Sequence, residues 1–166
     1  NTERIALIIG IEKYERTSDA PYAEKDAMYF LDYAKNILGI PENKIKYLTN
    51  SKAKRTEIKL AYKQWLSGRI DKNTEVILFF AGHGLATPDG KKLFLMPYDG
   101  ETSLLDDTAI LLSEIFEVLK GTNPKSVIAL IDACYSGQTR NNETLIADAR
   151  PITIVPIKNQ IPDNFI

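Results

Sequence analysis

The sequence predicts an α/β fold in which helices cover both faces of a mainly parallel β-sheet. Three continuous apolar runs are typical of strands buried on both faces. Segments with apolar residues at three- and four-residue steps, typical of amphipathic helices, separate these runs. Strands that alternate with helices in this way pair in parallel through right-handed crossovers. The three runs are Ile5–Ile9, Val76–Ala81 and Val127–Ile131.

Helical spacing also locates the crossover segments. Apolar residues recur from Ala23 at three- and four-residue steps until Gly39 and Pro41 end the pattern. The other two helices end at glycines in the same way, and a turn-forming Pro-Asp-Gly sequence precedes one of two short strands. We expect helices at Ala23–Leu38, Ile58–Leu66 and Leu112–Leu119, and short strands at Lys44–Leu48 and Leu93–Met96.

Composition limits the class of protein. The 166 residues fit one domain, and 44% hydrophobic with 26% charged residues is the balance of a globular protein with a real core. A net charge of −1 without a basic run argues against a nucleic-acid partner. The longest apolar run has six residues, which excludes a membrane span. The single cysteine excludes an internal disulfide, and with the single histidine it cannot complete a zinc site.

The periodic pattern ends at Gly137. The segment Gln138–Arg150 is polar, and three prolines interrupt the residues after it, which favours a long loop or extended connector. Phe165–Ile166 indicates the start of another apolar strand. We therefore expect a folded core at residues 1–137 and a connector at 138–166. We also expect the chain to be an excerpt, because it begins without methionine and stops in mid-domain.

The only cysteine and the only histidine occupy equivalent places in the predicted sheet. His83 lies three residues past Phe80 and Cys134 three past Ile131, at the carboxyl ends of strands, where sites of parallel sheets form. Cysteine needs a base, usually histidine, to act as a nucleophile. If the two strands are neighbours, the two side chains lie side by side. Small residues that let a substrate backbone come close flank both of them: Gly82, Gly84, Ala133, Ser136 and Gly137.

A structural interpretation competes with this one. A single cysteine or histidine next to an apolar segment is more often a core residue than a catalytic one. The shared position at strand ends and the small neighbours favour a site. Tyr14 and Arg16 lie in the loop after the first strand, near the expected rim of that site, but no sequence feature selects either.

Two segments around these residues resemble the motifs of caspase-like cysteine peptidases. Phe79–Gly84 (FFAGHG) resembles their histidine motif and Ile131–Gly137 (IDACYSG) their cysteine motif. Cys134 follows His83 by 51 residues, close to the spacing of about 50 in caspases. Animal caspases carry glutamine two residues before the cysteine. Asp132 stands there in this chain, which is similar to metacaspases, orthocaspases and related prokaryotic members of the clan.

The resemblance extends from Arg4 to about Gly137 and implies a three-layer α/β/α sandwich with peptidase activity. Cys134 would attack a peptide carbonyl and form a thioester acyl-enzyme, while His83 would handle the proton of the leaving group. The backbone amides of Gly84 and Cys134 would donate to the oxyanion, an effect of about 3 kcal/mol per donor. The clan generally uses the Cys–His dyad without a metal or an organic cofactor.

Two aspartates predict a preference for basic substrates. Asp132 lies two residues before Cys134, so in a strand its side chain shares the face of the nucleophile. A carboxylate there favours Arg or Lys over acidic residues, and similar families use this aspartate in a pocket for a basic side chain. A buried strand end would also be an unfavourable place for an unpaired carboxylate. Asp26 matches a second acidic pocket position of metacaspases, although an acidic first helical turn also complements the helix dipole.

Calcium is not assigned. Asp106–Asp107 resembles the paired aspartates that serve calcium in some metacaspases, but a calcium ion needs several oxygen ligands. Lys91–Lys92 and Asn141 stand where the family carries further acidic residues, so the ligand set is incomplete and cations lie nearby. A solvated acidic loop is the alternative interpretation.

The resemblance also implies partners and a location. We expect a protein or peptide substrate with Arg or Lys at the cleavage site, and a C-terminal segment that resembles a caspase small subunit. The resemblance and the single cysteine favour a cytoplasmic protein. Arg140 and Arg150 in the polar loop make self-processing a further expectation. Two alternatives remain open: a catalytically silent scaffold or interaction module that keeps the fold, and a regulatory thiol that does not require His83.

Overall fold

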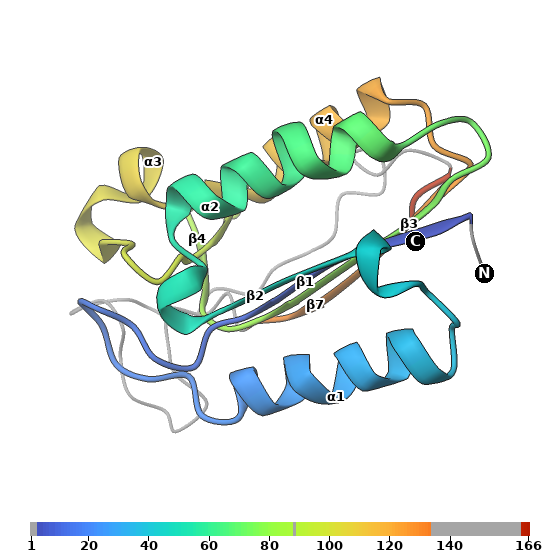
Figure 1. Cartoon of the computed structure of the whole chain (residues 1–166). Coiled ribbons are helices and arrows are strands. Elements are labelled where there is room, and N and C mark those ends of the chain that lie inside the picture. The colour runs from blue at the N-terminus through green and yellow to red at the C-terminus, as the bar shows by residue number, and fades with distance from the viewer. Residues whose placement is uncertain (1–2, 88, 134–163) are drawn as a thin grey trace.

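The structure is a computed structural model that describes residues 3–87, 89–133 and 164–166. In this part of the chain, a parallel sheet with strand order β2-β1-β3-β7 has helices on both faces (Figure 1). The predicted α/β architecture is confirmed. The strands are β1 (Arg4–Gly10), β2 (Ile45–Thr49), β3 (Glu75–Ala81) and β7 (Ser126–Asp132).

The helices form the two outer layers. α1 (Ala23–Asn36) packs over β1, β2 and β3 and buries Ala27 and Ala34 completely. α2 (Arg55–Leu60) and α4 (Leu112–Gly121) lie on the opposite face (Figure 1). No helix in the described ranges is long and apolar enough to cross a membrane. α2 continues as a π-helical turn, Ala61–Leu66, and a 3-10 turn, Ser67–Arg69.

The second helix begins three residues earlier than the apolar spacing predicts. The Asp99 side chain accepts a hydrogen bond from the backbone N–H of Arg55 at 2.8 Å and thereby satisfies an open donor of the first turn. Asp99 lies 44 residues further along the chain, so no local pattern reveals this contact. Apolar spacing marks only the buried face of a helix, which here starts with Ile58.

A second, antiparallel sheet begins directly after β3. β4 (Gly84–Ala86) pairs with β5 (Leu93–Leu95), and β5 pairs with β6 (Ile110–Leu111). The short strand expected near Leu93 is confirmed, whereas β4 was not predicted, because three residues are too few to show a strand pattern. Two short helical segments precede β6, a 3-10 turn at Thr102–Leu104 and α3 (Leu105–Thr108).

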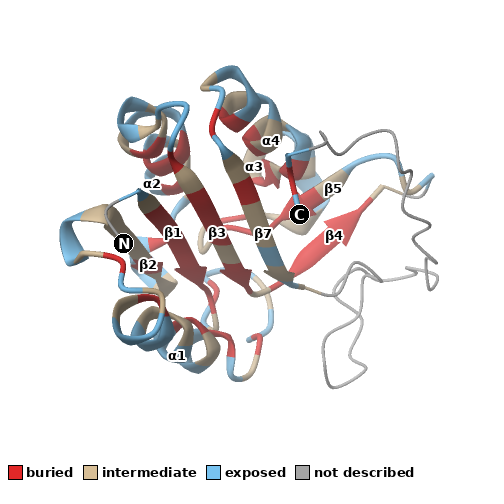
Figure 2. Cartoon of the chain, turned by 90° about the vertical axis from the view of Figure 1, so that its right-hand side faces the viewer, coloured by how far each residue is buried: buried red, intermediate tan, exposed pale blue. Residues whose placement is uncertain are grey.

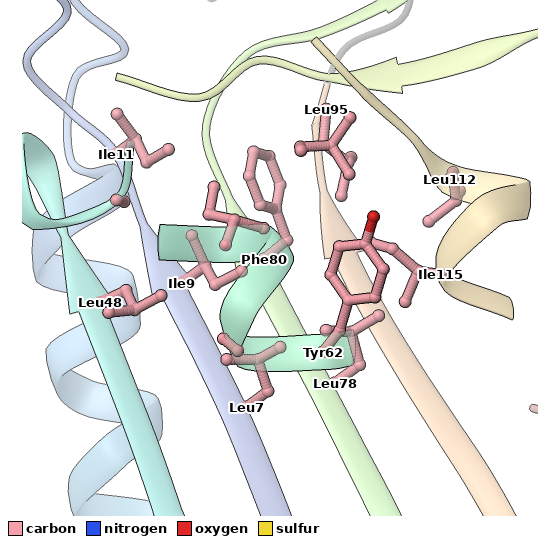
Figure 3. Close-up of a cluster of buried hydrophobic side chains, with 14 of the residues drawn as sticks. Leu7, Ile9, Ile11, Leu48, Tyr62, Leu78, Phe80, Leu95, Leu112 and Ile115 are labelled. Atoms are coloured by element: carbon pink, nitrogen blue, oxygen red, sulfur yellow. The ribbon is translucent and has the colours of Figure 1, made fainter. Parts of the chain in front are cut away.

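The two faces of β1 supply separate parts of the core. Ile5, Leu7 and Ile9 join the larger cluster below α2 and α4, part of which Figure 3 shows. Ala6 and Ile8 belong to the cluster below α1. All five are at most 1% exposed. Burial on both faces explains why the apolar run in β1 is continuous rather than alternating.

β7 is less buried than the sequence predicts. Leu130 is 42% exposed, and Asp132 at the end of the strand is also exposed. Leu130 lies opposite Phe79, which stacks on Phe30 of α1 with ring centroids 4.3 Å apart. α1 packs over the strands up to β3, so the side chains of β7 on this face have less cover (Figure 2). The expectation that Val127–Ile131 is buried on both faces is therefore wrong for its second half.

Residues 164–166 pair with β7. Val127 and Phe165 form a parallel bridge, and the N–H of Ala129 donates to the carbonyl of Ile166 at 2.7 Å. The sequence predicts a strand start at Phe165, and the described residues show a single bridge there. Cys134, the polar loop at 138–150 and the expected boundary after residue 137 lie outside the described residues.

Gly10 lets α1 approach the end of β1. A Cβ atom at this position would lie 2.3 Å from the Cβ of Ala27 and 2.8 Å from the carbonyl oxygen of Ala23. We predict that Gly10→Ala lowers the free energy of unfolding by about 1–3 kcal/mol, because the packed helix must shift. Gly68→Ala is the control, since its Cβ meets nothing within 4 Å. Urea denaturation measures both variants, and equal midpoints would contradict the prediction.

Candidate active site

The two strands that lead to the motif residues end side by side. β3 and β7 pair in parallel with Ala81 opposite Asp132, and the N–H of Gly82 donates to the Asp132 carbonyl at 3.2 Å. His83 follows this pair by two residues on the β3 side, and Cys134 follows it by two on the β7 side. The two strands are thus neighbours, which is the condition under which the sequence places the two side chains together. The Cys134 side chain itself lies outside the described residues.

The His83 imidazole is held by a backbone carbonyl. The residue is 5% exposed, and its Nε2 lies 2.9 Å from the carbonyl oxygen of Ser18. A carbonyl oxygen only accepts hydrogen bonds, so Nε2 carries the proton and donates. In the neutral ring the lone pair is then on Nδ1, which is the nitrogen able to accept a proton.

Tyr14, which no sequence feature selected, also contacts His83. Its ring stacks on the imidazole with centroids 4.8 Å apart and an interplanar angle of 28°. Its Oη accepts a hydrogen bond from the backbone N–H of His83 at 2.7 Å. Burial raises the pKa of Tyr14, so the phenol stays protonated. The two residues are 69 positions apart, which hides the contact from any local pattern.

The absence of a side chain at Gly82 makes room for Tyr14. Gly82 has a φ of 155°, which other residues rarely adopt, and an added Cβ would lie 2.6 Å from Tyr14 Oη. The same Cβ would lie 3.2 Å from the carbonyl oxygen of Ile11. The protein itself therefore fills the space beside Gly82, contrary to the expectation that this space admits a substrate backbone.

The loop between β1 and α1, which carries both contacts to the histidine, is anchored at the end of β2. Asn50 follows β2 with a left-handed φ of 43°. Its Oδ1 accepts hydrogen bonds from the backbone N–H groups of Glu12 and Lys13 at 2.9 and 3.0 Å. These two bonds fix the first part of the loop relative to the sheet.

The two aspartates expected to select basic substrates lie at the same edge of the sheet. Asp132 ends β7, and Asp26 is half-buried in the first turn of α1, which starts over Gly10 at the end of β1. The carboxyl ends of parallel strands share one edge, so both carboxylates lie at the edge that carries His83. The argument that Asp132 occupies a buried strand end is wrong, because the residue is exposed.

The acidic pair at 106–107 already has a cationic partner. Lys92 Nζ lies 2.7 Å from Asp106 Oδ1, and Asp107 is exposed. Within residues 3–87, 89–133 and 164–166, no group of three or more His, Cys, Asp or Glu side chains is placed to hold a metal ion. Asn141, the remaining position considered for calcium, lies outside this part of the chain.

The class of protein is defined by the fold and the site together. A parallel α/β sandwich carries a buried histidine at the end of one strand, and the neighbouring strand leads to the only cysteine of the sequence. Residues 3–163 match the caspase domain family, Peptidase_C14, so the chain belongs to this family and the expected caspase-like fold is confirmed. Among solved structures, it is similar to the crystal structure of protein GSU0716 from Geobacter sulfurreducens, with 19% identity and a TM-score of 0.63. That match covers 80% of this chain and 50% of the other, so the chain spans about half of that protein. No curated protein matches it significantly.

Proposed function

We propose that the chain is the catalytic part of a cysteine endopeptidase that cleaves after Arg or Lys with a Cys134–His83 dyad. One observation carries the proposal. His83 is buried at the end of β3 with Nε2 on the Ser18 carbonyl, and β3 is the neighbour of the strand that leads to the only cysteine. Membership of the caspase domain family supports a cysteine peptidase in general.

In the proposed reaction, Cys134 Sγ gives its proton to Nδ1 of His83 and attacks the carbonyl carbon of the substrate. A C–S bond forms and the carbonyl oxygen becomes an oxyanion. The C–N bond then breaks, the leaving amine takes the proton from His83, and a thioester remains. Water attacks the thioester while His83 accepts its proton. The C–S bond then breaks, the acid leaves, and His83 returns the proton to Sγ, which restores the thiol.

The backbone of Gly84 supports its proposed role as an oxyanion donor. Gly84 lies opposite Leu95, and the N–H of Met96 donates to the carbonyl of His83 at 3.0 Å. Bonded and non-bonded pairs alternate in an antiparallel ladder, so Gly84 occupies a non-bonded position and its N–H points away from β5. The ladder does not use this N–H, which leaves it for a substrate oxygen together with the amide of Cys134.

Basic specificity and the subtype are proposed from the acidic residues at the same edge. Asp132 ends β7 and Asp26 lies in the first turn of α1, both at the end of the sheet that carries His83. Carboxylates that face a substrate there would attract an Arg or Lys side chain and repel an acidic one. Asp132 in place of the glutamine of animal caspases supports a metacaspase- or orthocaspase-type member.

We also propose that residues 1–137 are the catalytic core and that 138–166 lead to a C-terminal segment like a caspase small subunit. The bridge between Phe165 and Val127 supports this arrangement, because it brings the chain after residue 163 alongside β7, the last strand in the sheet order. The proposed chemistry uses a thiol, an imidazole and water, and it requires no metal or organic cofactor.

A covalent peptide probe that ends in arginine tests the dyad in the full-length protein. Cys134→Ala should abolish both labelling and peptide cleavage without changing the melting temperature. His83→Ala should lower the labelling rate by about 10²- to 10⁴-fold, because the proton-transfer partner is lost. A loss below tenfold in His83→Ala would indicate a merely reactive thiol. No labelling of the native protein would indicate a scaffold.

Asp132→Asn tests the specificity. Peptides with Arg or Lys on the acyl side should be cut far better than those with Asp. The variant should lose about one to three orders of magnitude in kcat/KM for basic peptides, because a close charge pair is removed. Asp107→Asn, which removes an exposed carboxylate from α3, is the matched control and should change nothing. Efficient cleavage after Asp by the native protein would refute the assignment.

The polar loop at 138–150 generates a prediction about processing. An enzyme that cuts after basic residues and carries Arg140 and Arg150 shortly after its own nucleophile is expected to cut itself there, since such loops tolerate nicking. Mass spectrometry of the activated full-length protein should show a fragment that ends at Arg140 or Arg150. Fragments that also form in Cys134→Ala, or full activity with the loop intact, would contradict an activating role.

A further inference from the structure

We propose that Tyr14 positions His83 for catalysis: its hydroxyl holds the His83 backbone and its ring holds the imidazole, so that Nε2 stays on the Ser18 carbonyl. The inference rests on the proposed peptidase function and adds a residue outside both motifs. In this role Tyr14 acts through His83 and takes no part in proton transfer, because its buried phenol keeps its proton.

The Tyr14 hydroxyl takes the place of a ladder partner. His83 and Met96 stand opposite each other where the β4–β5 hairpin begins, and the Met96 N–H donates to the His83 carbonyl at 3.0 Å. In a regular bonded pair, the His83 N–H would donate back to the Met96 carbonyl. It donates instead to Tyr14 Oη at 2.7 Å. Because an unpaired buried N–H is unfavourable, this bond fixes the peptide group that carries the imidazole.

The Tyr14 ring restrains the side chain of the same residue. Ring centroids 4.8 Å apart and an angle of 28° make an aromatic contact along one face of the imidazole. Both residues are nearly inaccessible to water, at 9% exposure for Tyr14 and 5% for His83. A ring packed on this face opposes rotation of the imidazole plane, and the Nε2–Ser18 hydrogen bond depends on that plane.

The stacking ring and the Nε2 acceptor of His83 come from one anchored loop. Tyr14 and Ser18 are four residues apart between β1 and α1, and Asn50 holds the start of the loop through two backbone N–H groups. A movement of the loop therefore shifts the stacking ring and the Nε2 acceptor together. Orientation and tautomer of His83 are set by one element, and Tyr14 is the residue that ties this element to the backbone after β3.

A purely structural role for Tyr14 predicts a different pattern of effects, and Tyr62 supplies the matched control. Tyr62 is a fully buried tyrosine of the same core cluster, in the π-helical turn on the α2 side of the sheet (Figure 3). Tyr62→Phe removes a buried hydroxyl, as Tyr14→Phe does. Only Tyr14→Phe removes the acceptor of the His83 N–H.

Histidine ring NMR gives a readout that does not require activity. His83 is the only histidine of these 166 residues. In the ¹⁵N-histidine-labelled full-length protein, the imidazole signals that disappear in His83→Ala identify it. We expect the Nε2–H tautomer in the native protein and in Tyr62→Phe. We expect a mixture of tautomers in Tyr14→Phe. In peptide cleavage, Tyr14→Phe should lower kcat/KM by about 10- to 100-fold through kcat, with KM little changed.

The outcomes distinguish the positioning role of Tyr14 from the proposed peptidase function. The same tautomer and the same kcat in Tyr14→Phe as in Tyr62→Phe would overturn the positioning role. If Tyr14→Phe does not fold, amide hydrogen exchange of the native protein decides. The His83 N–H should exchange as slowly as the amides of β3, and fast exchange would overturn the inference. A changed His83 tautomer in Tyr14→Phe, together with no probe labelling of the native protein, would support the positioning of His83 and refute the peptidase.

Discussion

Because β3 and β7 pair in parallel and in register, both strands reach the same edge of the sheet together. Ala81 lies opposite Asp132, so His83 and Cys134 are each two residues beyond the last pair. A register shift of one residue would turn the side chains of one strand to the opposite face. Val76 and Phe80 of β3 are completely buried in the larger core cluster, so a shift would break the close packing around them. The apolar core thereby fixes the position of the histidine motif relative to the strand that leads to the cysteine motif.

Close packing of α1 on β1 brings the loop between them to His83. Gly10 lets the helix begin directly over the end of the strand, so residues 11–22 must fold over the edge where β3 also ends. This loop supplies the Ser18 carbonyl and the Tyr14 hydroxyl to the histidine. A contact between helix and strand that is far from the chemistry in sequence thus determines which atoms surround the imidazole.

Local sequence patterns predicted the secondary structure, because a strand or helix depends mainly on residues close together in the chain. Strands buried on both faces give continuous apolar runs, and amphipathic helices give apolar residues at three- and four-residue steps. These two signals predicted the parallel sheet and the positions of α1 and α4. Tyr14 and Gly82 show the limit: their contact is tertiary, and a tyrosine in a polar loop carries no sign of its partner. The exposure of Leu130 was missed for the same reason, since a run of apolar residues does not show which strand a helix leaves uncovered.

The exposure of Asp132 changes how the proposed basic specificity would arise. Had the carboxylate been buried and unpaired, the free protein would already be strained and any cation would relieve it. An exposed carboxylate is hydrated and screened, so it distinguishes charges weakly at a distance. A substrate side chain that covers it excludes water and strengthens the interaction, favourably for Arg or Lys and unfavourably for Asp. Discrimination by Asp132 would therefore develop as a substrate side chain covers it, with the half-buried Asp26 adding a charge that is less screened from the start.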